Sequence, residues 1–115
     1  MLSLTTVGRR SGQERSTAVA YVPHGDGWAV GALNLGSDRT PAWCLNLHSD
    51  PHAWVEVGGR RARVRAREAT GDEAKRLWAA LIDQFAVTRH SLELARRHVP
   101  VMVLEPVSDQ VDRAV

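Results

Sequence analysis

Residues 53–69 read AWVEVGGRRARVRAREA, two alternating runs on either side of Gly58-Gly59. Successive side chains of a strand point to opposite faces, so the small apolar residues of the second run share one face and its arginines share the other. A glycine pair between two such runs favours a two-residue hairpin turn. The stretch therefore predicts strands over 53–57 and 60–69, with Ala62, Val64 and Ala66 in the core and Arg61, Arg63, Arg65 and Arg67 in water.

Four further segments have the composition of strands. Residues 2–7 are short and β-branched and stop at Gly8, and residues 16–22 alternate in polarity. His24-Gly25-Asp26-Gly27 is typical of a four-residue hairpin turn, so residues 28–33 are expected to return as the partner strand. The apolar run 101–104 ends before Pro106. With the hairpin above, six strands are expected.

Helices are predicted in three places. Pro41 suits the first turn of a helix over residues 42–47, and Asp50-Pro51 ends it. Thr70 and Glu73 have the spacing of a capping box. Behind this box an apolar stripe predicts an amphipathic helix with Ala74, Leu77, Trp78, Leu81, Ile82 and Phe85 on one face. A second, weaker helix is expected over 89–97.

The order of these elements predicts a mainly β (α+β) protein. Six strands joined largely by hairpins suit a small closed antiparallel barrel, because closure removes exposed strand edges. Two or three helices would flank it. The length of 115 residues allows one domain, expected over 1–107, with residues 108–115 as a frayed tail.

Composition and charge narrow the class of protein. No apolar run approaches the ~20 residues that a membrane helix needs, so stable membrane insertion is not expected. Cys44 is the only cysteine, which excludes an internal disulfide and fits a cytoplasmic location. The net charge is only +2, but arginines cluster at 9–15 and at 60–67. Such clusters attract anions, whether nucleic acid, acidic lipid or a phosphorylated small molecule.

Three segments resemble the deazaflavin (F420)-dependent nitroreductase family, a branch of the split β-barrel flavin-binding superfamily. Residues 5–15, TTVGRRSGQER, are similar to its motif TTxGRKSGxxR. Residues 41–47, PAWCLNL, followed by Asp50-Pro51, are similar to PAWyxNLxxxP, and residues 99–106, VPVMVLEP, to its last strand. The resemblance covers roughly residues 2–107. It implies a six-stranded antiparallel split β-barrel.

The resemblance also implies a site for coenzyme F420. The phosphate and glutamate tail of the cofactor would be held by Arg9, Arg10, Ser11 and Arg15, and guanidinium groups in a glycine-rich turn are good anion receptors. The deazaflavin ring would lie against the strand end and the helix start. These wall residues are Gly31, Ala32, Leu33, Asn34, Pro41, Ala42 and Trp43.

By the same resemblance the protein is an F420-dependent reductase. Hydride would pass from the reduced deazaflavin to a planar, electron-poor small molecule such as an enone, quinone or nitroaromatic. Phe85, Thr88 and Ser91 stand where the nitroimidazole-reducing relatives carry tyrosines, so they are expected to face the substrate. No side chain is obligatory for catalysis. Water or the Ser91 hydroxyl would supply the proton, and a homodimer is implied by analogy.

Several alternatives stay open at this point. The barrel could bind FMN, or bind F420 without turnover. A nucleic-acid-binding barrel is disfavoured because exposed aromatics between the basic residues are lacking. His48 and His52 have i,i+4 spacing but lack a third ligand, so no metal is expected. Cys44 is interpreted as a packed thiol and Asn46 as a structural hydrogen-bonding group at the helix end.

Overall fold

The computed structural model describes residues 1–33, 39–95 and 97–107. Its elements are β1 (Leu2–Val7), β2 (Glu14–Val19), β3 (Val22–His24), β4 (Gly27–Gly31), α1 (Ala42–Ser49), β5 (His52–Val57), β6 (Arg60–Glu68), α2 (Gly71–Gln84), α3 (Val87–Leu94) and β7 (Val101–Pro106). The fold is mainly β with three helices, which confirms the expected α+β class. The expected tail over 108–115 lies outside the described residues.

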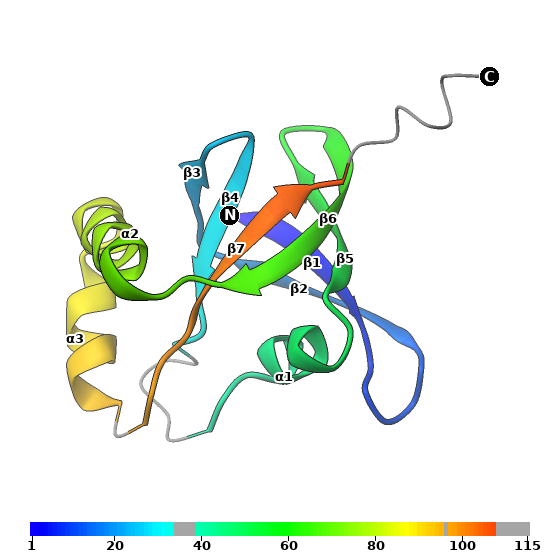
Figure 1. The fold of residues 1–115 in the computed structure, drawn as a ribbon, viewed down its shortest axis with the longest axis horizontal. Coiled ribbons are helices and arrows are strands. Elements are labelled where there is room, and N and C mark those ends of the chain that lie inside the picture. Colours follow the sequence, from blue (N-terminus) through cyan, green and yellow to red (C-terminus); the bar gives the residue numbers. More distant parts are fainter. Residues whose placement is uncertain (34–38, 96, 108–115) are drawn as a thin grey trace.

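All seven strands belong to one antiparallel sheet, in the order β2-β1-β5-β6-β7-β4-β3. The two edge strands, β2 and β3, are consecutive in the chain and are separated only by Ala20 and Tyr21. The sheet therefore curls until its two edges approach (Figure 1). Among the described strands, however, β2 and β3 are not hydrogen-bonded to each other, so the sheet is open and the closed barrel that was expected does not form.

The expected count of six strands was wrong. The strand expected over 16–22 bends at Ala20-Tyr21 and becomes two strands. One part, β2, pairs with β1, whereas the other, β3, pairs with β4 on the far edge of the sheet. One continuous stretch of chain thus serves both edges, and alternation of polarity cannot reveal such a bend.

Both predicted hairpins form. Val57 and Arg60 are paired across Gly58 and Gly59, whose φ angles of +58° and +77° explain why two glycines stand there. In the other hairpin His24 pairs with Gly27, so the turn has two residues where four were expected.

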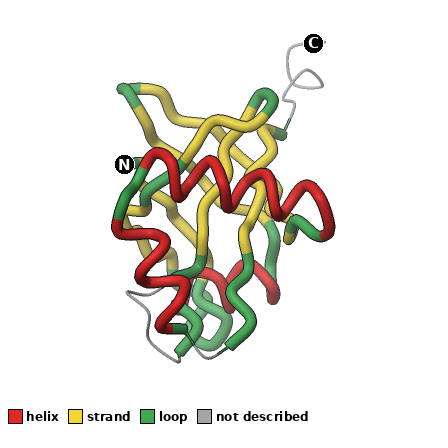
Figure 2. The backbone as a smooth tube through the Cα atoms, turned by 90° about the vertical axis from the view of Figure 1, so that its left-hand side faces the viewer, coloured by secondary structure: helices red, strands yellow, loops and turns green. Residues whose placement is uncertain are grey.

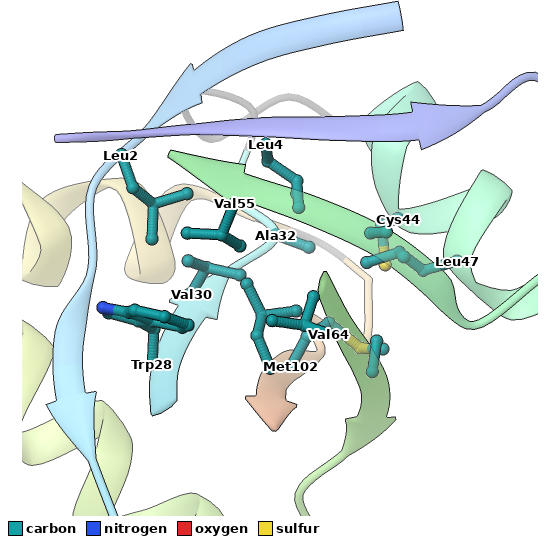
Figure 3. Packing of buried hydrophobic residues seen from close by; sticks show 13 residues of the cluster. Leu2, Leu4, Trp28, Val30, Ala32, Cys44, Leu47, Val55, Val64 and Met102 are labelled. Atoms are coloured by element: carbon teal, nitrogen blue, oxygen red, sulfur yellow. The ribbon is translucent and has the colours of Figure 1, made fainter. Parts of the chain in front are cut away.

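The core has two parts. One fills the inside of the curled sheet, where side chains from five strands meet Cys44 and Leu47 of α1 (Figure 3). The other lies between α2 and the opposite face of the sheet, where Leu77 and Leu81 pack against Val101 and Val103. Figure 2 shows α2 and α3 lying across this side of the sheet. The apolar stripe predicted for α2 is therefore the buried face of that helix.

The local details of two helices differ from expectation. α3 covers 87–94, whereas 89–97 was expected. The capping box was wrong: Thr70 precedes α2 but its side chain makes no capping hydrogen bond. The Glu73 carboxylate instead accepts hydrogen bonds from Arg67 Nη1 and Nη2 at 2.6 and 2.7 Å and lies 3.0 Å from His24 Nε2. A guanidinium fork is the stronger partner for a carboxylate.

The arginine face of β6 is exposed, as its alternation predicted. Arg61 stacks on the ring of Trp54 at 4.2 Å, and Arg67 pairs with Glu73 and Glu105. Part of this charge is therefore matched on the protein itself. No helix in the described part of the chain is long and apolar enough to cross a bilayer.

Candidate active site

A pocket of about 740 Å³ lies where β1 and β2, the start of α1 and the α2–α3 corner meet. This volume falls within the range in which proteins hold cofactors and small substrates. The described residues that line it are Met1, Thr6, Arg15, Ser16, Thr17, Ala18, Val19, Ala20, Gly31, Leu33, Arg39, Thr40, Pro41, Ala42, Trp43, Asn46, Leu81, Phe85, Val87, Thr88 and Ser91.

Most of the residues expected from the sequence come together in this pocket. Nine of them line it: Arg15, Gly31, Leu33, Pro41, Ala42, Trp43, Phe85, Thr88 and Ser91. Four others do not. Arg9, Arg10 and Ser11 are absent from the lining, and Ala32 is completely buried in the core. Asn34 lies outside the described residues.

The glycine-bracketed turn over 8–12 forms as predicted and is closed by its own backbone. Gly8 N–H donates to Gln13 O and Gly12 N–H donates to Gly8 O, each at 2.8 Å. The Ser11 hydroxyl accepts the N–H of Gln13 at 3.1 Å. Ser11 therefore shapes the turn, and its observed contact offers no support for the phosphate contact expected of it.

A buried polar cluster beside this turn joins β1 to α1. Asn46 Nδ2 donates to Thr6 Oγ1 at 3.1 Å, while Asn46 Oδ1 accepts from Arg9 N at 3.2 Å and from Arg9 Nη1 at 3.0 Å. Asn46 and Thr6 are 4% and 1% exposed. Asn46 is thus a structural hydrogen-bonding group, as predicted, although it stands in the middle of α1 where the helix end was expected. Thr6 was missed, although it is in phase with the core residues Leu2 and Leu4.

The charged side chains of the pocket share one sign. Among the described residues that line it, the charged ones are Arg15 and Arg39, and both are cationic. Arg15 is the strand partner of Thr6, so both side chains lie on the same face of the β1–β2 ladder. The first residues of α1 border the same space, and the N-terminus of a helix favours negative charge. A pocket with this lining is suited to an anion.

The part of the lining that comes from α2 and α3 combines apolar and hydroxyl groups. Leu81 and Phe85 come from the end of α2, and α3 contributes Val87 with Thr88 and Ser91. The two hydroxyl residues are buried, at 5% and 6% exposure. Hydroxyl groups in such a setting can orient or protonate a planar ligand without carrying charge.

The stretch of wall at the end of β4 is fixed by packing and by Arg97. Arg97 Nη2 donates to the carbonyl oxygens of Ala32 and Leu33 at 2.6 and 3.1 Å, which holds the end of β4 against the chain that follows α3. Gly31 was expected to make room for a flat ring. In the structure its missing side chain makes room for Trp78. Trp43, which was expected to wall the ring, is half-buried, packs against the core and lines the pocket.

The remaining candidate groups have structural surroundings. Cys44 is completely buried, and burial raises the pKa of its thiol to about 11, so it is the packed thiol that was expected. His48 and His52 face different carboxylates, those of Glu68 and Asp50. The described residues contain no group of three or more His, Cys, Asp or Glu side chains that could hold a metal ion.

The family described as F420H(2)-dependent quinone reductase matches residues 1–106. The chain belongs to this family. A Mycobacterium tuberculosis protein, whose name assigns it F420H(2)-dependent quinone reductase activity provisionally, is 32% identical to this chain over 98 residues. The match covers 85% of this chain and 82% of the relative. Another protein from that organism, named an F420H(2)-dependent quinone reductase, is 31% identical over 107 residues, 90% of this chain and 71% of the relative.

Two solved structures extend the likeness to the fold. The structure of an F420-H2 dependent reductase has a TM-score of 0.83 and 25% identity, covering 90% of this chain and 92% of that one. A structure described as a domain-swapped dimer has the same TM-score and identity, and the match covers 90% of this chain and 78% of that one. Membership of the quinone reductase family thus accounts for the curled-sheet fold and for the motifs that resemble deazaflavin-dependent enzymes.

Proposed function

We propose that the protein is an F420-dependent oxidoreductase that binds the reduced cofactor in the pocket and reduces a quinone. The observation that carries this proposal is the cationic lining of a pocket large enough for a cofactor, in a member of the F420H(2)-dependent quinone reductase family. F420 consists of a flat deazaflavin joined to a phosphate and a glutamate tail, so it has an anionic end and a planar end. The lining of the pocket likewise includes cationic, aromatic and apolar residues.

The anionic part of the cofactor would lie beside Arg15. Arg15 and Arg39 supply guanidinium groups, and Arg9 is one hydrogen bond from the lining through Asn46. We therefore assign Arg9 and Arg15 as the residues that bind the phosphate. Arg10, exposed in the same turn, adds positive charge without bordering the pocket.

The planar part would lie between Trp43 with Pro41 and the Gly31–Leu33 strand end. When bound, reduced F420 supplies a hydride. The chain contributes position: Leu81 and Phe85 exclude water, and Thr88 and Ser91 present hydroxyl groups on the substrate side. We assign the Ser91 hydroxyl as a relay that passes its proton to the reduced quinone oxygen and receives another from water.

Three broader parts of the proposal rest on separate observations. Residues 1–107 act as one domain, since the two core clusters together involve the sheet, α1 and α2.

The protein forms a homodimer, because the edge strand β2 is exposed along most of its length and a structural relative is a domain-swapped dimer. A cytoplasmic location fits the single, buried, reduced cysteine. Sedimentation velocity tests the dimer, and a monomer at micromolar concentration contradicts it.

Equilibrium binding tests the proposed ligand. Tryptophan fluorescence is recorded while F420 or FMN is added, and we expect F420 to bind at least ~10-fold more tightly. Arg15→Ala should weaken F420 binding by ~10-fold or more, because a hydrogen bond to a charged group is lost. Arg9→Ala combined with Arg10→Ala should abolish binding.

The matched control is Arg65→Ala, which removes an exposed arginine from the outer face of β6 and should leave F420 affinity unchanged. Tighter binding of FMN, or equal losses for Arg15→Ala and Arg65→Ala, would contradict the proposal. Binding of F420 without reduction of any quinone would identify a carrier.

A further inference from the structure

We infer that Asn46 is a positioning residue that holds Arg9 ready for the anionic end of the ligand. The inference rests on the proposed function and deepens it. Asn46 stands in the middle of α1, 37 positions along the chain from Arg9, and yet it makes both hydrogen bonds that Arg9 forms with described residues. Such a contact is specified by the fold, since chain neighbours play no part in it.

The geometry of the contact fixes the conformation of Arg9. One oxygen, Asn46 Oδ1, receives the backbone N–H of Arg9 at 3.2 Å and Nη1 of the same residue at 3.0 Å. The arginine side chain is therefore folded back toward its own backbone. A guanidinium has five N–H donors, so four stay available for a ligand. Orienting this long side chain in advance removes an entropy cost from binding.

The amide itself is held by a second contact. Its Nδ2 donates to Thr6 Oγ1 at 3.1 Å, in a site that is almost completely buried. The two N–H donors of Arg9 decide which way the amide faces, because a flipped amide would present an N–H to both of them. In this orientation the Thr6 hydroxyl accepts from Nδ2 and holds the amide in place. Thr6 is in turn the strand partner of Arg15. Arg9 thus contacts Asn46 through hydrogen bonds, and Arg15 lies beside Thr6 in the neighbouring strand.

The distinguishing property of a positioning residue is that it acts only through its partner. Asn46→Ala should weaken F420 binding roughly tenfold in the wild-type background, because Arg9 is no longer held. In an Arg9→Ala background the same change should have no further effect, so the two losses should not multiply. The matched cycle uses Arg65→Ala in place of Arg9→Ala. In that background Asn46→Ala should still weaken F420 binding by its full factor of roughly ten.

A second ligand gives an independent readout. A 5-deazaflavin nucleoside that lacks the phosphate and the tail has no anion for Arg9 to contact. Its affinity should be the same for wild type and Asn46→Ala. A residue with a merely structural role, or one that contacts the ring, would change the affinity for both ligands.

If Asn46→Ala does not fold, Thr6→Val supplies the test, since it removes the acceptor of Nδ2 with little change of volume. It should weaken F420 binding in the wild-type background and have no effect in the Arg9→Ala background, and Thr6→Ser should recover part of the loss. Failure of wild type to bind F420 overturns the proposed function itself. Binding by wild type with losses that multiply across the Arg9–Asn46 cycle overturns only the role given to Asn46.

Discussion

Gly31 and Trp78 are packed so closely that residue 31 has no room for a side chain: a Cβ there would lie 2.6 Å from Cη2 and 2.8 Å from Cζ3 of the indole. Trp78 belongs to the core between α2 and the sheet, and Gly31 borders the pocket at the end of β4. This contact fixes the position of α2, and with it Leu81 and Phe85, relative to the wall of the pocket.

Gly31→Ala should therefore lower stability by ~1–3 kcal/mol, the usual cost of overpacking. Chemical denaturation monitored by circular dichroism measures the loss. Adding Trp78→Phe removes the two ring atoms that clash, so the double variant should lose less than the two single variants together. Losses that simply add would show that the contact is not tight.

The Glu73 carboxylate should make stability depend on pH in the acid range. Hydrogen bonds from Arg67 and His24 lower the pKa of Glu73 from 4.5 to about 2. A lowered folded-state pKa stabilises the protein fully above pH 4.5, and the contribution disappears as the pH falls toward 2. Glu73→Gln should therefore have a lower Tm than wild type at pH 7 and the same Tm near pH 2.

The control for this pH dependence is Glu93→Gln, which changes an exposed glutamate of α3. Its Tm should follow that of wild type throughout. A gap between wild type and Glu73→Gln that stays constant from pH 7 to pH 2 would show that the Arg67–Glu73 contact does not stabilise the fold.

Cys44 should be inert in the native protein. Its thiol is completely buried, and burial raises its pKa to about 11. At pH 8 alkylation should be at least ~100-fold slower than for a free cysteine, because only the thiolate reacts. Mass spectrometry after iodoacetamide treatment checks this, with denatured protein as the fully labelled control. Rapid labelling of native protein would reveal an accessible thiol.

Local patterns in the sequence predict what local physics decides. The β5–β6 hairpin follows from alternation and two glycines, and α2 follows from its apolar stripe. The bend at Ala20-Tyr21 was not predictable, because it depends on which strands β2 and β3 find as partners. The capping box failed for the same reason: a partner from another element, Arg67, bound Glu73 more strongly.

The site divides in a similar way. Motif resemblance led to Arg15 and Trp43, since two of the family's three segments border the pocket, and Ser91, expected from the position of the relatives' tyrosines, lines it as well. It could not separate arginines that line the pocket from those beside it, because neighbours in one turn can face different ways. The contact between Arg9 and Asn46 joins residues 37 positions apart and required the folded chain.

Ser91 should contribute to turnover and little to binding. As a proton donor buried in the pocket wall, its replacement in Ser91→Ala should lower kcat by ~10²-fold with little change in the KM for the quinone. Ser49→Ala, on the exposed end of α1, is the control and should behave as wild type. An unchanged kcat for Ser91→Ala would assign the proton to water.

The most direct measurement mixes the purified protein with reduced F420 and a soluble quinone in the absence of oxygen. The return of the visible absorbance of oxidised deazaflavin reports hydride transfer. We predict many turnovers per protein molecule, with the rate abolished by the combination of Arg9→Ala and Arg10→Ala and unaffected by Arg65→Ala. An absorbance trace no faster than the mixture without protein would contradict the assignment of this pocket to F420-dependent quinone reduction.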